Sequence, residues 1–144
     1  MTMSGRISVE MMTIYRQARY RVIIDNQDYR IELGCSGGEL HQWLQQQGAH
    51  TAALITACNP YSEKLSDEQN RIAQLKLEAE LDRQGYHYYH GEGRNLAGTW
   101  IEPGVFILDI ERHDACCLAA RYQQNALVFL RSGPVCTLAE ILSA

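Results

Sequence analysis

Neutral polar side chains gather where a short apolar segment gives way to the start of an expected helix. They are Thr56, Asn59, Ser62 and Asn70. Sites in α/β proteins commonly lie at strand ends, and these hydroxyl and amide groups can donate and accept hydrogen bonds there. Helix N-termini also attract anions, but Asp67 and Glu68 in the first turn would repel one. Ordinary loop and capping chemistry is the alternative interpretation of the same residues.

A second polar group follows in a glycine-containing segment, residues 91–98, that we expect to be a loop. The chemistry-bearing side chains in it and after it are Glu92, Arg94, Trp100 and Glu102. A carboxylate here could act as a general base, and the indole could form an apolar wall of a pocket. The alternative is a solvated loop in which Arg94 pairs with a carboxylate and Trp100 fills an edge of the core.

Nucleophilic catalysis by a cysteine receives little support. Cys58 and Cys116 are the candidates, and such a thiol needs a positioned base. His113 lies three residues before Cys116 on an expected helix, so the two could be neighbours. Adjacent cysteines on an alanine-rich helix are nevertheless more typical of core packing.

The bulk composition indicates one globular domain. The chain has 144 residues, of which 46% are hydrophobic and 21% charged, so it can build one core and is not disordered in composition. Its net charge is −4, and the densest basic group, residues 16–21, is offset by Asp25 and Asp28. Binding to nucleic acid is therefore disfavoured. The N-terminus has no apolar core of signal-peptide length and no stretch is long enough to span a membrane, so no membrane partner is expected.

The cysteines are expected to be free thiols in a cytoplasmic protein. There are five of them, Cys35, Cys58, Cys116, Cys117 and Cys136. The number is odd, no Cys-x-x-Cys pair occurs, and without an export signal the expected compartment is reducing. His87 and His90 lie in an expected strand, where positions three apart face opposite sides, so no metal site is predicted. No cofactor is predicted, because the chain has no nucleotide-binding glycine loop.

Turn residues and runs of β-forming residues divide the chain into its expected elements. Residues 1–18 are expected to be a flexible N-terminal arm, and residues 19–144 a single α/β domain. Predicted strands cover residues 19–24 and 29–33 as a hairpin, 51–58 as a buried central strand, then 86–90, 105–110 and 126–130. Core spacing of apolar residues predicts a helix over residues 112–123.

Capping boxes predict where three helices begin. They are Ser36–Glu39, Ser66–Gln69 and Thr137–Glu140. On a helical wheel, the long helix after the second box has one apolar stripe with Ile72 and Leu75. A second stripe, nearly opposite, carries Leu77 and Leu81. We expect the sheet to bury one stripe, and a helix, the arm or a second subunit to bury the other. Asn70 falls on the second stripe, so it needs a hydrogen-bond partner.

The expected order of elements is β-β-α-β-α-β-β-α-β. This order indicates a mixed β-sheet with helices packed on it, in an α/β or α+β fold. Such a sheet could bring the corner at residues 56–70 and the segment at residues 91–102 to one edge. The two polar groups would then face each other across one cleft.

Residues 55–70 spell the pattern ITAxNPxSxxLSxxxN. This pattern resembles the signature of DUF3293, a family of short uncharacterised bacterial proteins. The family pattern continues with a leucine-rich helix, a Trp-x-Glu element (here Trp100 and Glu102) and a Gln-x-Ala strand start, so the resemblance covers about residues 19–130. It implies a compact bacterial domain and no particular reaction. The chain departs from the pattern at Pro103, where a small polar residue such as serine is expected, and this puts any role of that residue in doubt.

Three classes of function are left open by the sequence. The leading hypothesis is a domain that binds a small molecule or a protein partner in the polar cleft. The second is a hydrolase or transferase that uses Glu92 or Glu102 as its base. The third is a homodimeric interaction module built on the two-striped helix.

Overall fold

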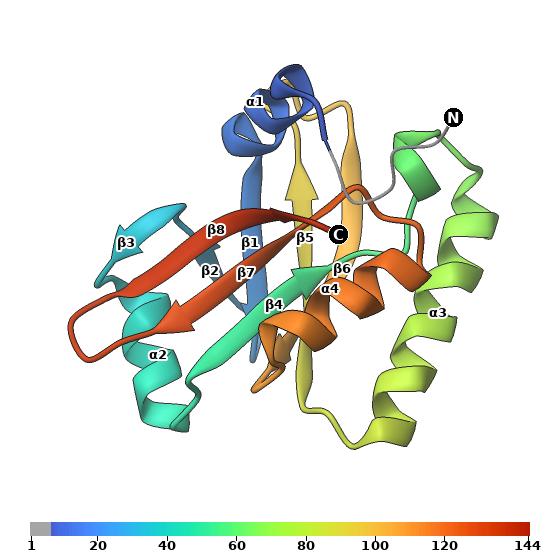
Figure 1. Cartoon of the computed structure of the whole chain (residues 1–144). Coiled ribbons are helices and arrows are strands. Elements are labelled where there is room, and N and C mark those ends of the chain that lie inside the picture. The colour runs from blue at the N-terminus through green and yellow to red at the C-terminus, as the bar shows by residue number, and fades with distance from the viewer. Residues whose placement is uncertain (1–6) are drawn as a thin grey trace.

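The computed structural model describes residues 7–144 and shows one eight-stranded sheet with helices packed on it (Figure 1). The strand order is β2-β1-β5-β6-β4-β7-β8-β3. The predicted α/β or α+β architecture is confirmed, and the order of elements is roughly the expected one. Every neighbouring strand pair is antiparallel, however, so the sheet is not mixed in direction.

Eight strands and five helical segments make up the described part of the chain. The strands are β1 (Arg19–Ile24), β2 (Gln27–Ile31), β3 (Gly34–Ser36), β4 (Thr51–Ile55), β5 (Tyr88–Arg94), β6 (Ile101–Leu108), β7 (Ala126–Ser132) and β8 (Thr137–Ser143). The helices are α1 (Val9–Gln17), α2 (Glu39–Gln47), the 3₁₀ turn η1 (Pro60–Ser62), α3 (Asp67–Gln84) and α4 (Arg112–Arg121). Among residues 7–144, no helix combines the length and the apolar character needed to cross a membrane.

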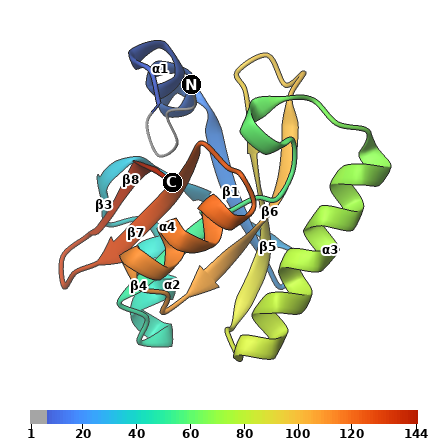
Figure 2. The same cartoon turned by 45° about the vertical axis from the view of Figure 1, so that its right-hand side comes forward.

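The sheet has a hydrophobic core on each face. On one face, Leu40 and Leu44 of α2 pack with Phe106 of β6. On the other, Leu77 of α3 and Leu118 of α4 pack with residues of the central strands. Figure 2 shows α3 and α4 lying along this second face. Strand β4 runs between β6 and β7 and has its last four residues buried, which confirms the predicted central strand.

The N-terminal segment forms a helix where a flexible arm was expected. Ser8 caps α1 by accepting a hydrogen bond from the Met11 amide at 3.1 Å. Residues 1–6 of the expected arm lie outside the described residues. In both views α1 lies at the same end of the sheet as the β5–β6 turn and η1 (Figures 1 and 2).

One predicted capping box is confirmed and two are wrong. Ser66 and Gln69 form the reciprocal box at the start of α3. Ser36 and Thr137 instead lie opposite each other in the β3–β8 pair. A disulfide between Cys35 and Cys136 joins the same two segments, so the expectation of free thiols is wrong for these two residues. Pairing between distant segments here overrides local capping chemistry.

The two apolar stripes of α3 have different environments. Leu77 and Leu81 are fully buried against the sheet. Ile72 and Leu75 remain 55% and 52% exposed, so the expectation that both stripes are buried is wrong within this chain. Association of two copies through α3 stays a prediction.

Candidate functional site

The chain turns sharply between β4 and α3, and Asn59 is the centre of this corner. Its backbone is left-handed, with φ of 48°, as is that of Tyr61 and Ser62 just after it. Left-handed conformations are unfavourable for residues other than glycine, although asparagine tolerates them better than tyrosine or serine, so the corner must be held by other interactions. Asn59 exchanges two hydrogen bonds with the Asn70 side chain, at 2.8 and 2.9 Å, and its Oδ1 also accepts from the Leu65 amide at 2.9 Å. The expected partner of Asn70 is therefore Asn59.

The remaining side-chain hydrogen bond of Asn59 reaches across to strand β6. Its Nδ2 donates to Oε2 of Glu102 at 2.8 Å, and the Trp100 indole Nε1 donates to the same oxygen at 2.9 Å. Burial raises the pKa of the Glu102 carboxyl, against the opposing effect of these two hydrogen bonds. The other oxygen, Oε1, accepts no hydrogen bond from residues 7–144 and is not sealed from solvent.

Glu102 borders a cavity of about 350 Å³ at the end of the sheet. One wall comes from α1, through Met11, Ile14 and Tyr15, and the floor from sheet residues such as Tyr20. The walls are largely apolar, and the volume falls within the usual range for small-molecule sites. The cavity therefore offers an apolar space with a carboxylate at its border.

Several of the predicted site residues come together at this cavity. Those that border it are Thr56, Asn59, Ser62, Arg94, Trp100 and Glu102. Asn70 stands behind the corner and acts through Asn59. This geometry supports the expectation that the corner and the 91–102 segment share one edge of the sheet, with two exceptions. Glu92 is absent from the cavity, and Arg94 borders it but binds Glu92 on the opposite face.

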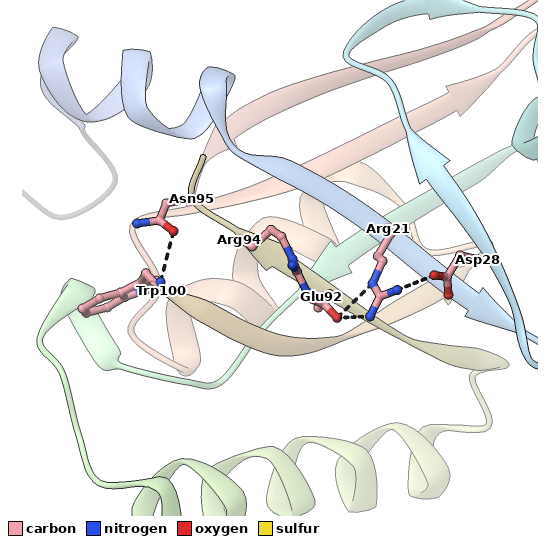
Figure 3. A network of polar contacts seen from close by, with 6 residues as sticks. All are labelled: Arg21, Asp28, Glu92, Arg94, Asn95 and Trp100. Carbon is pink, nitrogen blue, oxygen red and sulfur yellow. Dashed lines mark hydrogen bonds and ion pairs between the residues drawn. The ribbon is translucent and has the colours of Figure 1, made fainter. Parts of the chain in front are cut away.

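Glu92 lies on the opposite face of the sheet, so its predicted place in the cleft is wrong. In the β5–β6 pair, Gly93 is opposite Glu102 and Glu92 is opposite Pro103. Adjacent strand residues point to opposite faces, so the two glutamates cannot share a cleft. Figure 3 shows Glu92 bound instead to Arg21 of the neighbouring strand β1, with Trp100 lying apart from this pair. Part of the expected loop, Gly91 to Arg94, is strand β5.

Glu92 is held in an ion-pair network. Its two oxygens accept hydrogen bonds from Arg21 Nε at 2.9 Å and from the Arg94 guanidinium at 2.9 and 3.1 Å. Partial burial raises the pKa of Glu92, but the two arginines outweigh this and leave the pKa below its usual value. Such a carboxylate stays ionised and paired, which is unsuited to a general base.

The hydroxyl groups of the corner are used within the fold. Thr56 Oγ1 donates to the Pro103 carbonyl at 2.6 Å and accepts from the Cys58 amide at 3.0 Å. Ser62 Oγ lies 3.2 Å from the Tyr15 hydroxyl and accepts from Asn125 at 3.1 Å. These contacts favour the capped-corner interpretation for Thr56 and Ser62, and they leave Glu102 Oε1 as the open carboxylate oxygen beside them.

Sequence reasoning missed the α1 wall of the cavity. Met11, Ile14 and Tyr15 follow one another at the spacing of one helix face, directly after Ser8, a preferred N-cap residue. That signal was present in the sequence. Tyr20 lies in the predicted strand β1, but its contact with α1 was not predicted. Its hydroxyl donates to the Tyr15 carbonyl at 2.6 Å and so links α1 to the sheet.

The free cysteines do not form a reactive site at the cavity. Cys58 is buried, and burial raises the pKa of its thiol. A raised pKa disfavours the thiolate, which is the nucleophilic form. Cys117 lies 3.5 Å from His113 on the exposed surface of α4, and neither residue borders the cavity.

A protein-family model described as "Protein of unknown function (DUF3293)" matches residues 55–127, about half of the chain. The chain belongs to this family. The DUF3293 match begins at the end of β4 and ends at the start of β7, so it includes the Asn59 corner and Glu102. The α1 wall of the cavity precedes the matched residues. No curated protein and no solved structure matches the chain.

Proposed function

We propose that this DUF3293 protein binds a small molecule with an apolar body and an amine or other N–H donor in the cavity beside Glu102. The observation that carries the proposal is the unequal use of the two carboxylate oxygens. Asn59 and Trp100 fix Oε2, whereas Oε1 has no hydrogen-bond donor among the described residues. An ionised carboxylate is only an acceptor, so a ligand group that meets Oε1 must be a donor.

The apolar walls support the same ligand class. Met11, Ile14 and Leu54 offer no hydrogen bonds, and the Tyr20 hydroxyl is already bound to Tyr15. A ligand gains affinity here by burying carbon, and gains orientation from one charged contact. Trp100 is fixed by its bond to Glu102 and by Lys64, whose Nζ lies 5.6 Å from the ring centroid. The carboxylate is thus positioned before a ligand arrives.

Replacing Glu102 by glutamine should weaken amine binding about tenfold, because a charge-assisted hydrogen bond contributes about 1.5 to 3 kcal/mol and 1.4 kcal/mol is about a factor of ten. Glutamine keeps an oxygen for Asn59 and Trp100 and removes the charge. Calorimetry with tyramine, and with 4-hydroxyphenylacetate as a matched acid, measures the effect. Glu63→Gln is the control, since Glu63 is an exposed residue outside the cavity. Equal affinity of both variants for tyramine, or equal binding of the acid, would contradict the proposal.

Tyramine affinity should fall as the pH is lowered through the raised pKa of Glu102, above the value of 4.5 for an ordinary glutamate. The amine stays protonated throughout this range, so the carboxylate is the group that titrates. The effect on folding has the opposite sign. A raised pKa in the folded state favours the protonated form, so this contribution to stability is complete below the unfolded-state pKa and is lost as the pH rises through the folded-state value. Calorimetry across a pH series checks the prediction, and a midpoint at or below 4.5 would contradict it.

Acid–base catalysis is the second function that the cavity favours. A half-buried carboxylate with a raised pKa and one open oxygen can exchange a proton with a bound substrate. Of the two glutamates considered for this role, Glu92 is paired with arginines on the opposite face, and Glu102 alone borders the cavity. Turnover of chromogenic esters that Glu102→Gln abolishes and Glu63→Gln preserves would favour a hydrolase over a binding protein.

A further inference from the structure

Four arginines line a hollow on the other side of β1 and β5 from Glu102, and we call this the arginine hollow. They are Arg19, Arg21, Arg30 and Arg94. The hollow measures about 350 Å³ and is also lined by Tyr20 and Asp28. With Glu92 beneath it, the group has four positive and two negative side chains, in a chain whose net charge is −4. Folding therefore concentrates positive charge that is dispersed along the sequence.

The arginines lie directly opposite one another across the strands. Arg21 is in register with Arg30 of β2, and Arg19 is in register with Arg94 of β5. Like charges at directly opposed positions destabilise a sheet. The fold keeps two such pairs side by side, at the edge of the sheet formed by β2, β1 and β5. An anion bound above them would remove this repulsion.

The carboxylates offset only two of the four arginines. Asp28 and Glu92 both pair with Arg21, and Glu92 also pairs with Arg94 (Figure 3). Arg19 and Arg30 are exposed and form no ion pair among residues 7–144. The hollow thus combines two guanidinium groups held in place with two that are free to bind a ligand.

We propose that the arginine hollow binds a small molecule through a phosphate or diphosphate group. The guanidinium fork matches phosphate oxygens in bidentate geometry. The excess of two positive charges suits a phosphate group that carries about two negative charges at neutral pH. Four arginines on a short sheet edge are few for a nucleic-acid surface, which needs a longer basic track. The hollow shares Tyr20 and Arg94 with the border of the Glu102 cavity, but Arg19, Arg21 and Arg30 line the hollow alone. The proposal does not depend on the function proposed for the cavity.

Calorimetric titration of the full chain with inorganic pyrophosphate at low salt tests the proposal. Arg19→Gln and Arg30→Gln should each weaken binding about tenfold, and the double variant about a hundredfold. Removing one member of a like-charge pair should leave the melting temperature unchanged or raise it, so the loss of binding reports on the site. Arg71→Gln is the matched control, because Arg71 pairs with Glu68 on α3 and lies outside the hollow.

Three results would overturn the proposal. The first is equal affinity for pyrophosphate in the wild type and the double variant. The second is an equal loss of affinity in Arg71→Gln, which would indicate binding to net charge and no defined site. The third is binding of a short single-stranded oligonucleotide without binding of pyrophosphate, which would identify a nucleic-acid surface. Tight binding of pyrophosphate that only the Arg19 and Arg30 variants lose would confirm it.

Discussion

Replacing Asn59 by alanine is expected to lower the free energy of unfolding by about 4 kcal/mol, since each buried polar group left without its partner costs about 1 to 3 kcal/mol. The change removes three side-chain hydrogen bonds at once, to Asn70, Leu65 and Glu102. It also places alanine at a φ of 48°, which asparagine tolerates better than other residues with a Cβ. Urea unfolding of the wild type and the variant measures the difference.

Two further variants separate the causes of this loss. Asn59→Gly also lacks the side chain but accepts the positive φ, so it should be more stable than the alanine variant by about 1 kcal/mol. Asn59→Asp keeps the acceptor for Leu65 and Asn70 but brings a second carboxylate to Glu102, and it should raise the pKa of Glu102 further. A loss below about 1 kcal/mol for Asn59→Ala, the size of one exposed hydrogen bond, would show that the corner does not depend on Asn59.

The corner and the helix after it could be predicted because their signals are local. Ser66 and Gln69 form a cap within one helical turn, and left-handed Gly85 ends the helix. The helical wheel placed Asn70 on a half-buried face of α3. A buried amide needs a hydrogen-bond partner, and the polar residues of the corner are the nearest candidates along the chain. The link from Asn59 to Glu102 spans 43 residues, and no local pattern contains it.

Which side chains of β5 and β6 face the cavity could not be predicted, because this depends on the register between the strands. Glu92 was expected in a loop and Glu102 just after it, and both were candidates for the same cleft. Gly91 to Arg94 are part of strand β5, and in a strand a shift of one position in register moves a side chain to the opposite face. Gly93 opposite Glu102 leaves Glu92 with the arginines on the other side. The arginine hollow was missed for the same reason, since register brings Arg30 and Arg94 beside Arg19 and Arg21.

The end of the chain shows how strand pairing overrides a local signal. Thr137 and Glu140 have the spacing of a capping box, but they belong to β8, which pairs with β7 along its whole length. Thr137 Oγ1 lies 2.8 Å from Nδ1 of the buried His41, 96 residues away. Backbone pairing with β7 satisfies the amides that a helix would satisfy internally, and burial of Ala139 and Leu142 stabilises the strand.

Replacing Gly91 by alanine is expected to destabilise the protein by about 3 kcal/mol, the upper part of the usual range for overpacking a core. A Cβ at this position would lie 2.7 Å from the Arg21 carbonyl oxygen and 2.9 Å from Leu54 Cδ1. The first contact is with backbone of the neighbouring strand β1, which cannot move without breaking the β1–β5 ladder. Gly104 lies directly opposite in β6 and is equally close to the Ile55 carbonyl oxygen, at 2.8 Å. The two glycines therefore mark where strands approach each other too closely for any side chain.

Gly93→Ala is the matched control, two residues along the same strand. Its Cβ would lie 3.1 Å from the ring of Tyr20, a side chain that can shift, so the expected loss is about 1 kcal/mol. Neither glycine has a positive φ, and alanine lowers the entropy of the unfolded chain at both sites, so the difference between the variants reports on the steric contact alone. Equal losses in urea unfolding would place the cause in strand propensity. A larger loss for Gly91→Ala, with Gly104→Ala close to it, would show that the strands at this pair leave no room for a side chain.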